Sequence, residues 1–226
     1  MKIVCISDTH YTDKHLLDLP IPNGDVLIHA GDATIRGEVG ETAHFMNWFA
    51  SQPHAVKIFV PGNHDWWFER AGQGYQWSDD VRTLINEFYE FEFNGTIYTV
   101  FGSPWSLKFN NWAFNVTEKQ MNTMFQSVLP LTKPLDILIT HEPPYSIMDF
   151  YGAQHINKDG TVLGRGEYLG SKAVRAFVNQ TKPKLHIFGH IHSMHGVQTK
   201  GPTTFINAAI LDDDYKVVNK PILVEL

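Results

Sequence analysis

Two histidines separated by a single residue, His190 and His192, stand in the segment KLHIFGHIHSMHG (184–196). Neutral imidazole is among the commonest metal ligands, and side chains two apart in an extended segment point the same way. The pair therefore predicts metal binding. Two further histidines of the segment allow simpler interpretations: His186 lies in an apolar run that suits a core position, and His195 is either a loop residue or a substrate contact.

Asp, Asn and His side chains recur in short clusters at four earlier places, which read Asp8-Thr9-His10, Gly31-Asp32, Gly62-Asn63-His64-Asp65 and His141-Glu142. The donors are oxygen and imidazole with no thiolate, which favours Mn, Fe, Zn or Ni over a structural zinc site built from cysteines. Seven candidate ligands are too many for one ion and suit two divalent ions about 3.5–4 Å apart that share a carboxylate. The candidates are Asp8, His10, Asp32, Asn63, His141, His190 and His192.

Each cluster directly follows a short apolar run rich in β-branched residues. Such runs predict strands that are buried on both faces. Because open α/β sheets bind ligands beyond the carboxyl ends of their strands, the clusters are expected to converge at one edge. The predicted strands cover residues 2–7, 25–30, 55–60, 136–140 and 184–188.

Amphipathic stretches lie between the predicted strands. Helices are predicted over 38–52, over 79–89, after Thr117 and after Ser171. The first is expected to bury Val39, Ala43, Met46 and Ala50, the second Val81, Leu84, Ile85 and Phe88, and the fourth Val174, Phe177 and Val178. Thr117 and Gln120 match a capping box. Asn94-Gly95 predicts a type I′ hairpin turn within residues 91–102.

The composition limits both the fold and the partners. The chain has 226 residues, 43% of them hydrophobic and 13% aromatic, which is enough for a substantial core, and no linker or repeat divides it. We therefore expect a single domain over residues 1–226. A net charge of −6 argues against an extended nucleic-acid surface, whereas a small anionic substrate can bind where cations invert the local field.

The first residues and the cysteine content bear on location. The apolar run in MKIVCISDTH is too short for a signal peptide or a membrane span. Cys5 is the single cysteine, so no internal disulfide forms, which suits a reducing compartment. We expect a cytoplasmic protein with no membrane partner, present as a monomer or a homodimer.

Taken together, the clusters resemble the motif set of the calcineurin-like metallophosphoesterases in order and in approximate spacing. A finer likeness is to the small metallophosphoesterase-domain-containing, phosphodiesterase-like subfamily. It rests on FGSPWSLKFNNWAFN (101–115), DILITHEPP (136–144), PKLHIFGHIH (183–192) and TTFINAA (203–209). The resemblance implies an α/β fold, a four-layer α/β/β/α sandwich with two facing mixed β-sheets.

The resemblance also implies a role for each polar residue. Asp8, His10 and His192 hold a first ion, Asn63, His141 and His190 hold a second, and Asp32 bridges the two. A hydroxide shared by the ions attacks phosphorus in line, with no phosphoenzyme. His64 is a catalytic residue and not a ligand: it assists the phosphate or protonates the leaving oxygen.

The chain departs from one branch of the superfamily in residues 31–37. Phosphoprotein phosphatases carry G-D-x-x-D-R-G, in which the second Asp orients the catalytic histidine, but here Ile35 stands at that position. The partner that orients His64 is therefore either missing or supplied elsewhere. Some members of the small subfamily have Gly in place of the first His of G-H-x-H, whereas this chain retains His190, so both ion sites are expected to be complete.

These features predict a metal-dependent phosphodiesterase for small phosphodiesters such as cyclic nucleotides. The alternatives are a phosphomonoesterase, a nuclease, or a low-activity binding or scaffold protein on the same fold. Substrate contacts are predicted at Asn63, His64, His195 and Arg36.

Four tryptophans lie near the motifs: Trp66, Trp67, Trp105 and Trp112. Their positions suit packing, although an aromatic ring at the pocket rim can stack a nucleobase. Residues 142–170 are expected to shape the pocket rim.

Overall fold

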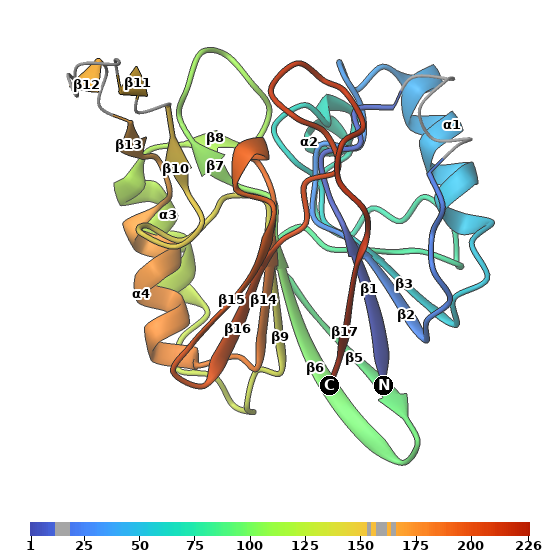
Figure 1. Cartoon of the computed structure of the whole chain (residues 1–226). Coiled ribbons are helices and arrows are strands. Elements are labelled where there is room, and N and C mark those ends of the chain that lie inside the picture. Colours follow the sequence, from blue (N-terminus) through green and yellow to red (C-terminus); the bar gives the residue numbers. More distant parts are fainter. Residues whose placement is uncertain (12–18, 153–154, 157–161, 164–165) are drawn as a thin grey trace.

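The structure, a computed structural model, describes residues 1–11, 19–152, 155–156, 162–163 and 166–226. Two β-sheets face each other in the middle of the molecule (Figure 1). Helices α1 (Val39–Ala50) and α2 (Trp66–Ala71) belong to one side, and α3 (Glu118–Ser127) and α4 (Lys172–Thr181) cover the other. The predicted four-layer α/β/β/α sandwich is confirmed.

The first sheet is parallel except at one edge. Its order is β17 (Ile222–Glu225), β1 (Lys2–Ile6), β2 (Val26–His29), β3 (Val56–Phe59) and β4 (Arg82–Thr83), and only β17 runs antiparallel to its neighbour. Every residue of β2 and all but the first residue of β1 are buried, because both faces of these strands are covered.

The second sheet has antiparallel strands at both edges. Its order is β15 (Gly196–Lys200), β16 (Thr203–Asn207), β14 (Leu185–Phe188), β9 (Ile137–Thr140), β6 (Thr96–Ser103) and β5 (Glu87–Phe93). The four inner strands are mutually parallel. Short strand pairs lie in the loops: β7 (Ser106–Leu107) with β8 (Asn115–Val116), β10 (Phe150–Tyr151) with β13 (Glu167–Tyr168), and β11 (His155–Ile156) with β12 (Val162–Leu163).

Three hydrophobic layers separate the four layers of structure. Alternation along β1 sends Ile3 and Cys5 between the sheets and Val4 and Ile6 toward α1. Between the sheets, Ile28 and Ile58 share a cluster with Ile139 and Ile187. Phe45 and Phe59 lie in the layer under α1, and Phe101, Phe125 and Phe177 lie in the layer under α3 and α4. The two sheets are thereby fixed relative to each other.

Three of the four predicted helices are confirmed. Around α3, the N–H of Gln120 donates to Oγ1 of Thr117 at 3.3 Å and the N–H of Thr117 donates to Oε1 of Gln120 at 2.9 Å, as a capping box requires. The buried face of α1 was predicted one position off, because the helix buries Thr42, Phe45, Met46 and Phe49 while Val39 is 55% exposed. Among the described residues, no helix has the length and apolar character to cross a membrane.

The helix predicted over 79–89 is wrong. Residues 82–83 form β4 beside β3, and β5 begins at Glu87. The adjacent residues Leu84 and Ile85 fall in different core clusters, on opposite sides of the first sheet, as an extended chain requires. The predicted hairpin is confirmed, since Asn94 and Gly95 have φ angles of 49° and 78° and join Phe93 to Thr96.

Candidate metal centre

The carboxyl ends of β1, β2, β3, β9 and β14 meet at the upper edge of the two sheets in Figure 1. The loops that follow these strands bring together all seven predicted ligands and His64. A pocket of about 310 Å³ opens above them, lined by His10, Asp32, Asn63, His64, Phe109, Asn110, Trp112, Tyr151, His190, His192, Asp213 and Tyr215. Asp8 and His141 lie fully buried beside it.

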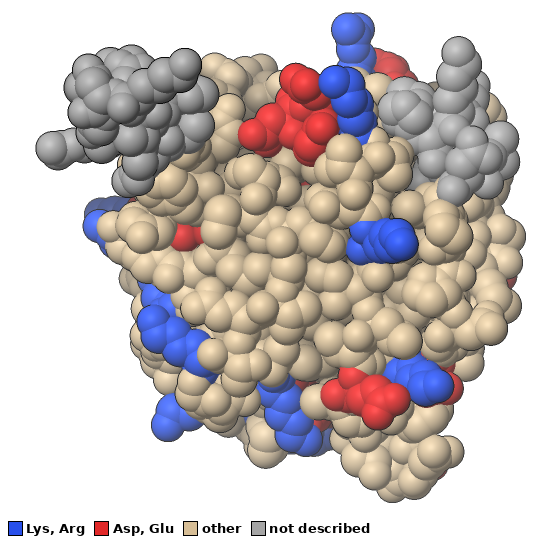
Figure 2. All heavy atoms as spheres, in the orientation of Figure 1, with Lys and Arg blue, Asp and Glu red and all other residues tan. Residues whose placement is uncertain are grey.

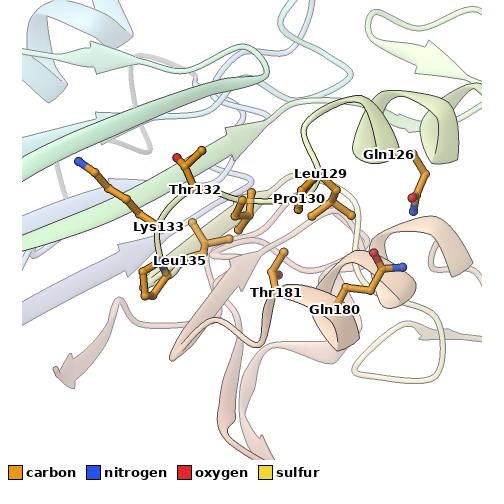
Figure 3. A pocket seen from close by; sticks show the side chains of 10 residues that line it. Gln126, Leu129, Pro130, Thr132, Lys133, Leu135, Gln180 and Thr181 are labelled. Carbon is orange, nitrogen blue, oxygen red and sulfur yellow. The ribbon is translucent and has the colours of Figure 1, made fainter.

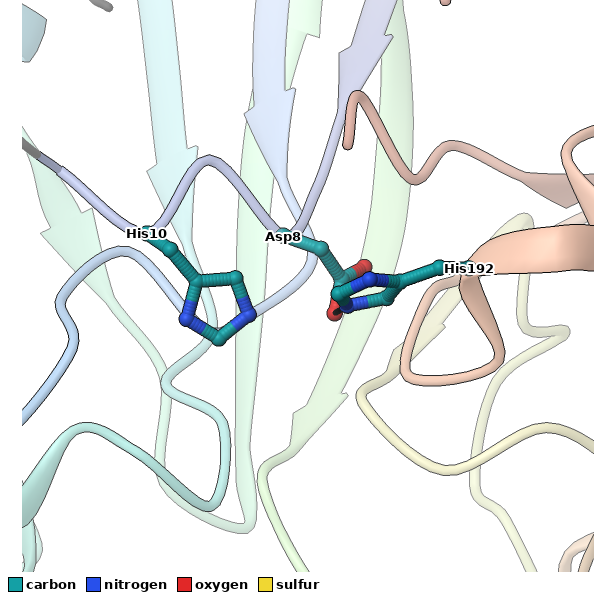
Figure 4. A group of neighbouring side chains, drawn as sticks. All are labelled: Asp8, His10 and His192. Atoms are coloured by element: carbon teal, nitrogen blue, oxygen red, sulfur yellow. Dashed lines mark ion pairs between the residues drawn. The ribbon is translucent and has the colours of Figure 1, made fainter. Parts of the chain in front are cut away.

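One group consists of Asp8, His10 and His192, whose candidate ligand atoms all lie within 4.8 Å of one another (Figure 4). Nε2 of His192 is 3.4 Å from Oδ1 of Asp8. The backbone at Asp8 and His10 has φ angles of 51° and 36°, in a region that L-residues seldom adopt. Such strain persists where the surroundings fix it, and here the loop is held by a hydrogen bond from the Asp8 N–H to the Gly31 carbonyl at 2.9 Å.

Gly189 explains why a glycine opens the G-H-x-H segment. A Cβ at this position would collide with Oδ2 of Asp8 and Oγ of Ser7. The bare backbone lets the end of β14 approach β1, and the N–H of His190 then donates to both carboxylate oxygens of Asp8 at 3.1 Å. The motif therefore joins residues 182 positions apart.

The second group is built around His141. Its Nε2 lies 2.9 Å from Oδ1 of Asn63 and 3.3 Å from Oδ2 of Asp32. Asp32, His141 and His190 form another set with candidate ligand atoms within 4.8 Å of one another. Oδ2 of Asp32 is also 3.7 Å from Nε2 of His10, so this carboxylate stands between the two groups, where a bridging ligand has to be.

Three histidines have their rings oriented by the backbone. Nδ1 of His10, His141 and His192 donates to the carbonyls of Thr34, Ala30 and Asp212 at 3.2, 3.0 and 2.9 Å. A carbonyl only accepts, so Nε2 is the nitrogen left for the centre, as is usual for metal-binding histidines. Nε2 of His10 is buried and has no hydrogen-bond partner. An orphaned imidazole nitrogen beside carboxylates fits a cation.

The protonation of the histidines also fits metal binding. Burial lowers the pKa of His10 to about 3 and that of His190 to about 4, so both are neutral donors. Burial likewise opposes the charge on His141 and His192, but Asp32 raises the pKa of His141 to about 10 and Asp8 raises that of His192 to about 9. Protons on these two rings balance the carboxylates, and metal binding would displace them.

His64 has a partner that the sequence does not reveal. Its ring Nδ1 donates to the backbone carbonyl of Ile35 at 2.7 Å, and the backbone N–H of His64 donates to Oδ1 of Asp32 at 2.8 Å. The ring stacks on Trp112 with centroids 4.0 Å apart. At the position where protein phosphatases have an orienting carboxylate, this chain therefore orients His64 through a neutral main-chain acceptor. Nε2 is left on the pocket side, 3.9 Å from Oδ2 of Asp32.

Residues 1–194 match the model of the family described as calcineurin-like phosphoesterase, or Metallophos. The chain belongs to this family. The human metallophosphoesterase domain-containing protein 1 is 34% identical over 246 residues, which cover 100% of this chain and 71% of the human protein. A Caenorhabditis elegans UPF0046 protein is 34% identical over 241 residues, covering 100% of this chain and 81% of its own length.

Solved structures share the fold at low identity. Phosphopantetheinyl hydrolase (PptH) from Mycobacterium tuberculosis has a TM-score of 0.58 and 14% identity, over 95% of this chain and 90% of that one. Calcineurin-like phosphoesterases use divalent metal ions, and the donor set described above suits such ions. The protein is a metal-dependent phosphoesterase.

Asp65 stabilises the phosphoesterase site without facing it. The buried carboxylate accepts N–H groups of Gly62, Ala33 and Thr34 at 2.7, 3.2 and 3.0 Å, and the Thr34 hydroxyl at 2.7 Å. These bonds join the loop after β2 to the loop after β3. Asp65 therefore fixes the turn that carries Asn63 and His64, as its place in the sequence suggests.

The predicted substrate contacts are only partly at the pocket. Asn63 and His64 line it, whereas Arg36 and His195 do not. Arg36 is exposed, and the His195 ring bonds the carbonyl of Ala209. Of the tryptophans, Trp112 lines the pocket, while Trp66, Trp67 and Trp105 pack against the core cluster under α1.

Sequence reasoning gave no role to four residues that line the pocket. Phe109 and Asn110 lie in the segment 101–115 that carries the family resemblance, whereas Asp213 and Tyr215 belong to no recognisable motif. Tyr151 falls within 142–170, the segment expected to shape the rim. A larger pocket of about 700 Å³ lies elsewhere, at the C-terminal ends of α3 and α4 (Figure 3). Its lining residues, Gln126, Leu129–Leu135, Gln180 and Thr181, include no His, Asp or Glu, so it lacks the chemistry of the metal centre.

Proposed function

We propose that this metal-dependent phosphoesterase is a phosphodiesterase that hydrolyses small phosphodiesters such as cyclic nucleotides. The observation that carries the proposal is the charge of the pocket. The described residues that line it include no Lys or Arg. A monoester dianion brings an additional negative charge for which this pocket offers no fixed cation, whereas a diester brings a single one.

The seven predicted ligands would hold two divalent ions. When bound, divalent ions supply positive charge for the phosphoryl group and make water a stronger acid. Asp8, His10 and His192 would hold one ion, Asn63, His141 and His190 the other, and Asp32 both. Holding both ions from one carboxylate keeps them close enough to act on a single phosphoryl group.

His64 is placed to act on the substrate directly. With Nδ1 bound to the Ile35 carbonyl, Nε2 is the nitrogen on the pocket side, 3.9 Å from Oδ2 of Asp32. From there it donates a proton to the leaving oxygen or a hydrogen bond to a phosphoryl oxygen. The stacked Trp112 ring keeps the imidazole plane fixed.

The aromatic rim supports a substrate with a flat organic group. Trp112, Tyr151 and Tyr215 line the pocket, and Phe109, also at the rim, is 69% exposed. Exposed rings at a pocket mouth offer surfaces on which a nucleobase can stack. Cyclic nucleotides combine such a base with a monoanionic diester.

The test compares kcat/KM for bis-p-nitrophenyl phosphate, p-nitrophenyl phosphate, and 2′,3′- and 3′,5′-cyclic nucleotides, all with Mn²⁺, beside a chelated sample. We expect the diester to exceed the monoester by about tenfold or more, since one charge near the site is worth about that much at short range. A preference for the monoester would make the protein a phosphomonoesterase. If the metal-loaded protein turned over none of these esters, the protein would be assigned as a binding or scaffold protein.

A further inference from the structure

One segment beside the centre brings an acidic and an aromatic side chain to the pocket. It is the turn over residues 212–216, between β16 and β17, here called the aspartate turn. Oδ1 of Asp212 accepts the N–H groups of Asp214 and Lys216 at 3.0 and 2.8 Å. Backbone hydrogen bonds between Asp212 and Lys216 (3.0 Å) and between Tyr215 and Asp212 (2.9 Å) close the turn. These bonds give it a defined shape.

The aspartate turn is joined to the metal centre. The carbonyl of Asp212 is the acceptor that orients Nδ1 of His192, at 2.9 Å. The ring of Tyr215 meets His10 edge to face, with centroids 4.8 Å apart, and lies 5.8 Å from His192. The turn therefore stands at a fixed distance from the reacting groups.

Tyr215 occupies an unfavourable backbone conformation. Its φ angle is 60°, a value that bulky L-residues rarely adopt, and its side chain is 44% exposed. Strained residues of this kind cluster at sites where a side chain has to be held in place. The rings of Trp112, His64, His10 and Tyr215 follow one another at centroid distances of 4.0, 4.6 and 4.8 Å, so an aromatic ring stands at each end of the row.

The aspartate turn also places a negative charge at the pocket. Asp214 pairs with Nζ of Lys216 at 3.1 Å, and Oδ1 of Asp212 is used by the backbone. Asp213 is exposed and lines the pocket, and no lining residue that the structure describes is a Lys or Arg that could neutralise it. Acidic side chains gather at the top of the face in Figure 2, with basic side chains beside them, over the loop that joins β16 to β17 in Figure 1.

We propose that the aspartate turn determines the substrate class of the site: Tyr215 supports the organic group of the substrate, and Asp213 excludes substrates with any negative charge beyond that of one phosphodiester. This inference rests on the proposed phosphodiesterase activity and narrows it. The accepted substrates are monoanionic diesters whose ester groups are neutral, aromatic or positively charged. Rejection of an alternative by a like charge is an established route to specificity.

The charge is tested with three esters that release the same leaving group. They are p-nitrophenyl phosphorylcholine, bis-p-nitrophenyl phosphate and p-nitrophenyl phosphate, with net charges of about 0, −1 and −2 near pH 8. Each kcat/KM is expressed as a ratio to the value for the bis ester. In Asp213→Asn this ratio should rise about threefold for the monoester and fall about threefold for the choline ester. A change of this size is expected from removing one solvent-screened charge several ångströms from the substrate. Asp213→Lys should shift both ratios further, and 0.5 M salt should reduce the shifts.

The matched control is Asp79→Asn, which makes the same change in net charge at an exposed position beside a different pocket, near the start of β3. In Asp79→Asn, the kcat/KM ratios of the monoester and the choline ester to the bis ester should equal those of the unsubstituted protein. Equal ratios in Asp213→Asn as well would overturn the inference while leaving the proposed function intact. A monoester preference in the unsubstituted protein would instead defeat the proposed function itself.

Tyr215 is tested by two substitutions that treat the ring and the backbone separately. Tyr215→Phe keeps the ring and should keep KM for the bis ester. Tyr215→Gly suits the positive φ, removes the ring, and should raise KM about tenfold with metal content unchanged. An unchanged KM in Tyr215→Gly would show that the ring does not support the substrate. A loss of metal in this variant would show instead that the ring serves the ligands.

Discussion

The ligand group around Asp8 and the ligand group around His141 differ in how the protein surrounds them. In the first, His10 and His192 are 1% and 9% exposed, and a backbone carbonyl orients each ring. In the second, the side chain of His190 is 25% exposed, and its Nε2 lies 4.0 Å from the carboxylate of Glu142. One group is enclosed by main chain, while the other has a ligand open to solvent.

This contrast indicates that the two ions bind with unequal strength. A ligand held in place before the ion arrives loses little freedom on binding, and its outer partner sharpens its orientation. His190 meets these conditions less well than His10. We therefore expect a tighter ion at Asp8 and a more readily exchanged ion at His141, with Asp32 linking the two.

The largest effect is expected from Asp32→Ala, which removes the carboxylate that stands between the two groups. Both ions should be lost, and kcat/KM should fall on the order of 10³-fold or more, because the charge stabilisation goes with them. Elemental analysis of metal per chain is the measurement, with Asp79→Ala as the control. Two ions retained in Asp32→Ala would rule out the bridging position.

His64 lies outside the two ligand groups, although its candidate ligand atom is within 4.8 Å of those of His10 and Asp32. His64→Ala therefore tests whether this ring acts in proton transfer or as a ligand. Both ions should stay, and turnover of alkyl esters should fall on the order of 10²–10⁴-fold. The loss should be smaller for p-nitrophenyl esters, whose leaving group needs little protonation. An equal loss for both ester types would assign His64 to binding of the phosphoryl oxygens.

The inequality of the groups is tested directly by His10→Ala and His190→Ala. Titration with Mn²⁺ should show two binding phases in the unsubstituted protein. His10→Ala should weaken the tighter phase and His190→Ala the weaker one, each on the order of 10²-fold, since a ligand contributes more than an outer partner. Loss of the tighter binding phase in His190→Ala would contradict the expected difference in affinity between the two groups.

A smaller change is expected from Glu142→Gln. Glu142 is fully buried, and one carboxylate oxygen accepts the Leu107 N–H at 3.0 Å, so Gln can keep that bond through its own carbonyl. Burial raises the pKa of Glu142 to about 8. Loss of its negative charge should therefore weaken the second ion about tenfold above pH 8 and leave the first unchanged. Glu90→Gln, at the exposed pair with Lys133, is the control. Equal weakening of both phases would point to a general loss of structure.

The sequence predicted the five strands that carry the centre. Their apolar runs fit strands buried on both faces, and the polar clusters that follow them fit loops at one edge of the sheets. It also predicted which seven side chains converge, although their roles as ligands stay predictions. It failed over 79–89, where Val81, Leu84 and Ile85 have a helical spacing that an extended chain satisfies by sending neighbours to opposite sides of a sheet.

Other features left no trace in residue types. Ile35 orients His64 through a backbone carbonyl, a group that every residue has, so no sequence pattern reports it. The same holds for the carbonyls behind His10, His141 and His192. Asp213 and Tyr215 reach the pocket only because the hydrogen bonds of Asp212 bend the chain there.

The backbone at His190 has a φ angle of 70°, which glycine adopts more easily than histidine. A His190→Gly substitution would remove a predicted ligand and relax the main chain in the same step. A lineage can therefore pass from two ions toward one by a single substitution that the fold accepts without strain. The return path, from glycine to histidine, has to force the chain back into that conformation, so the loss is easier than the recovery.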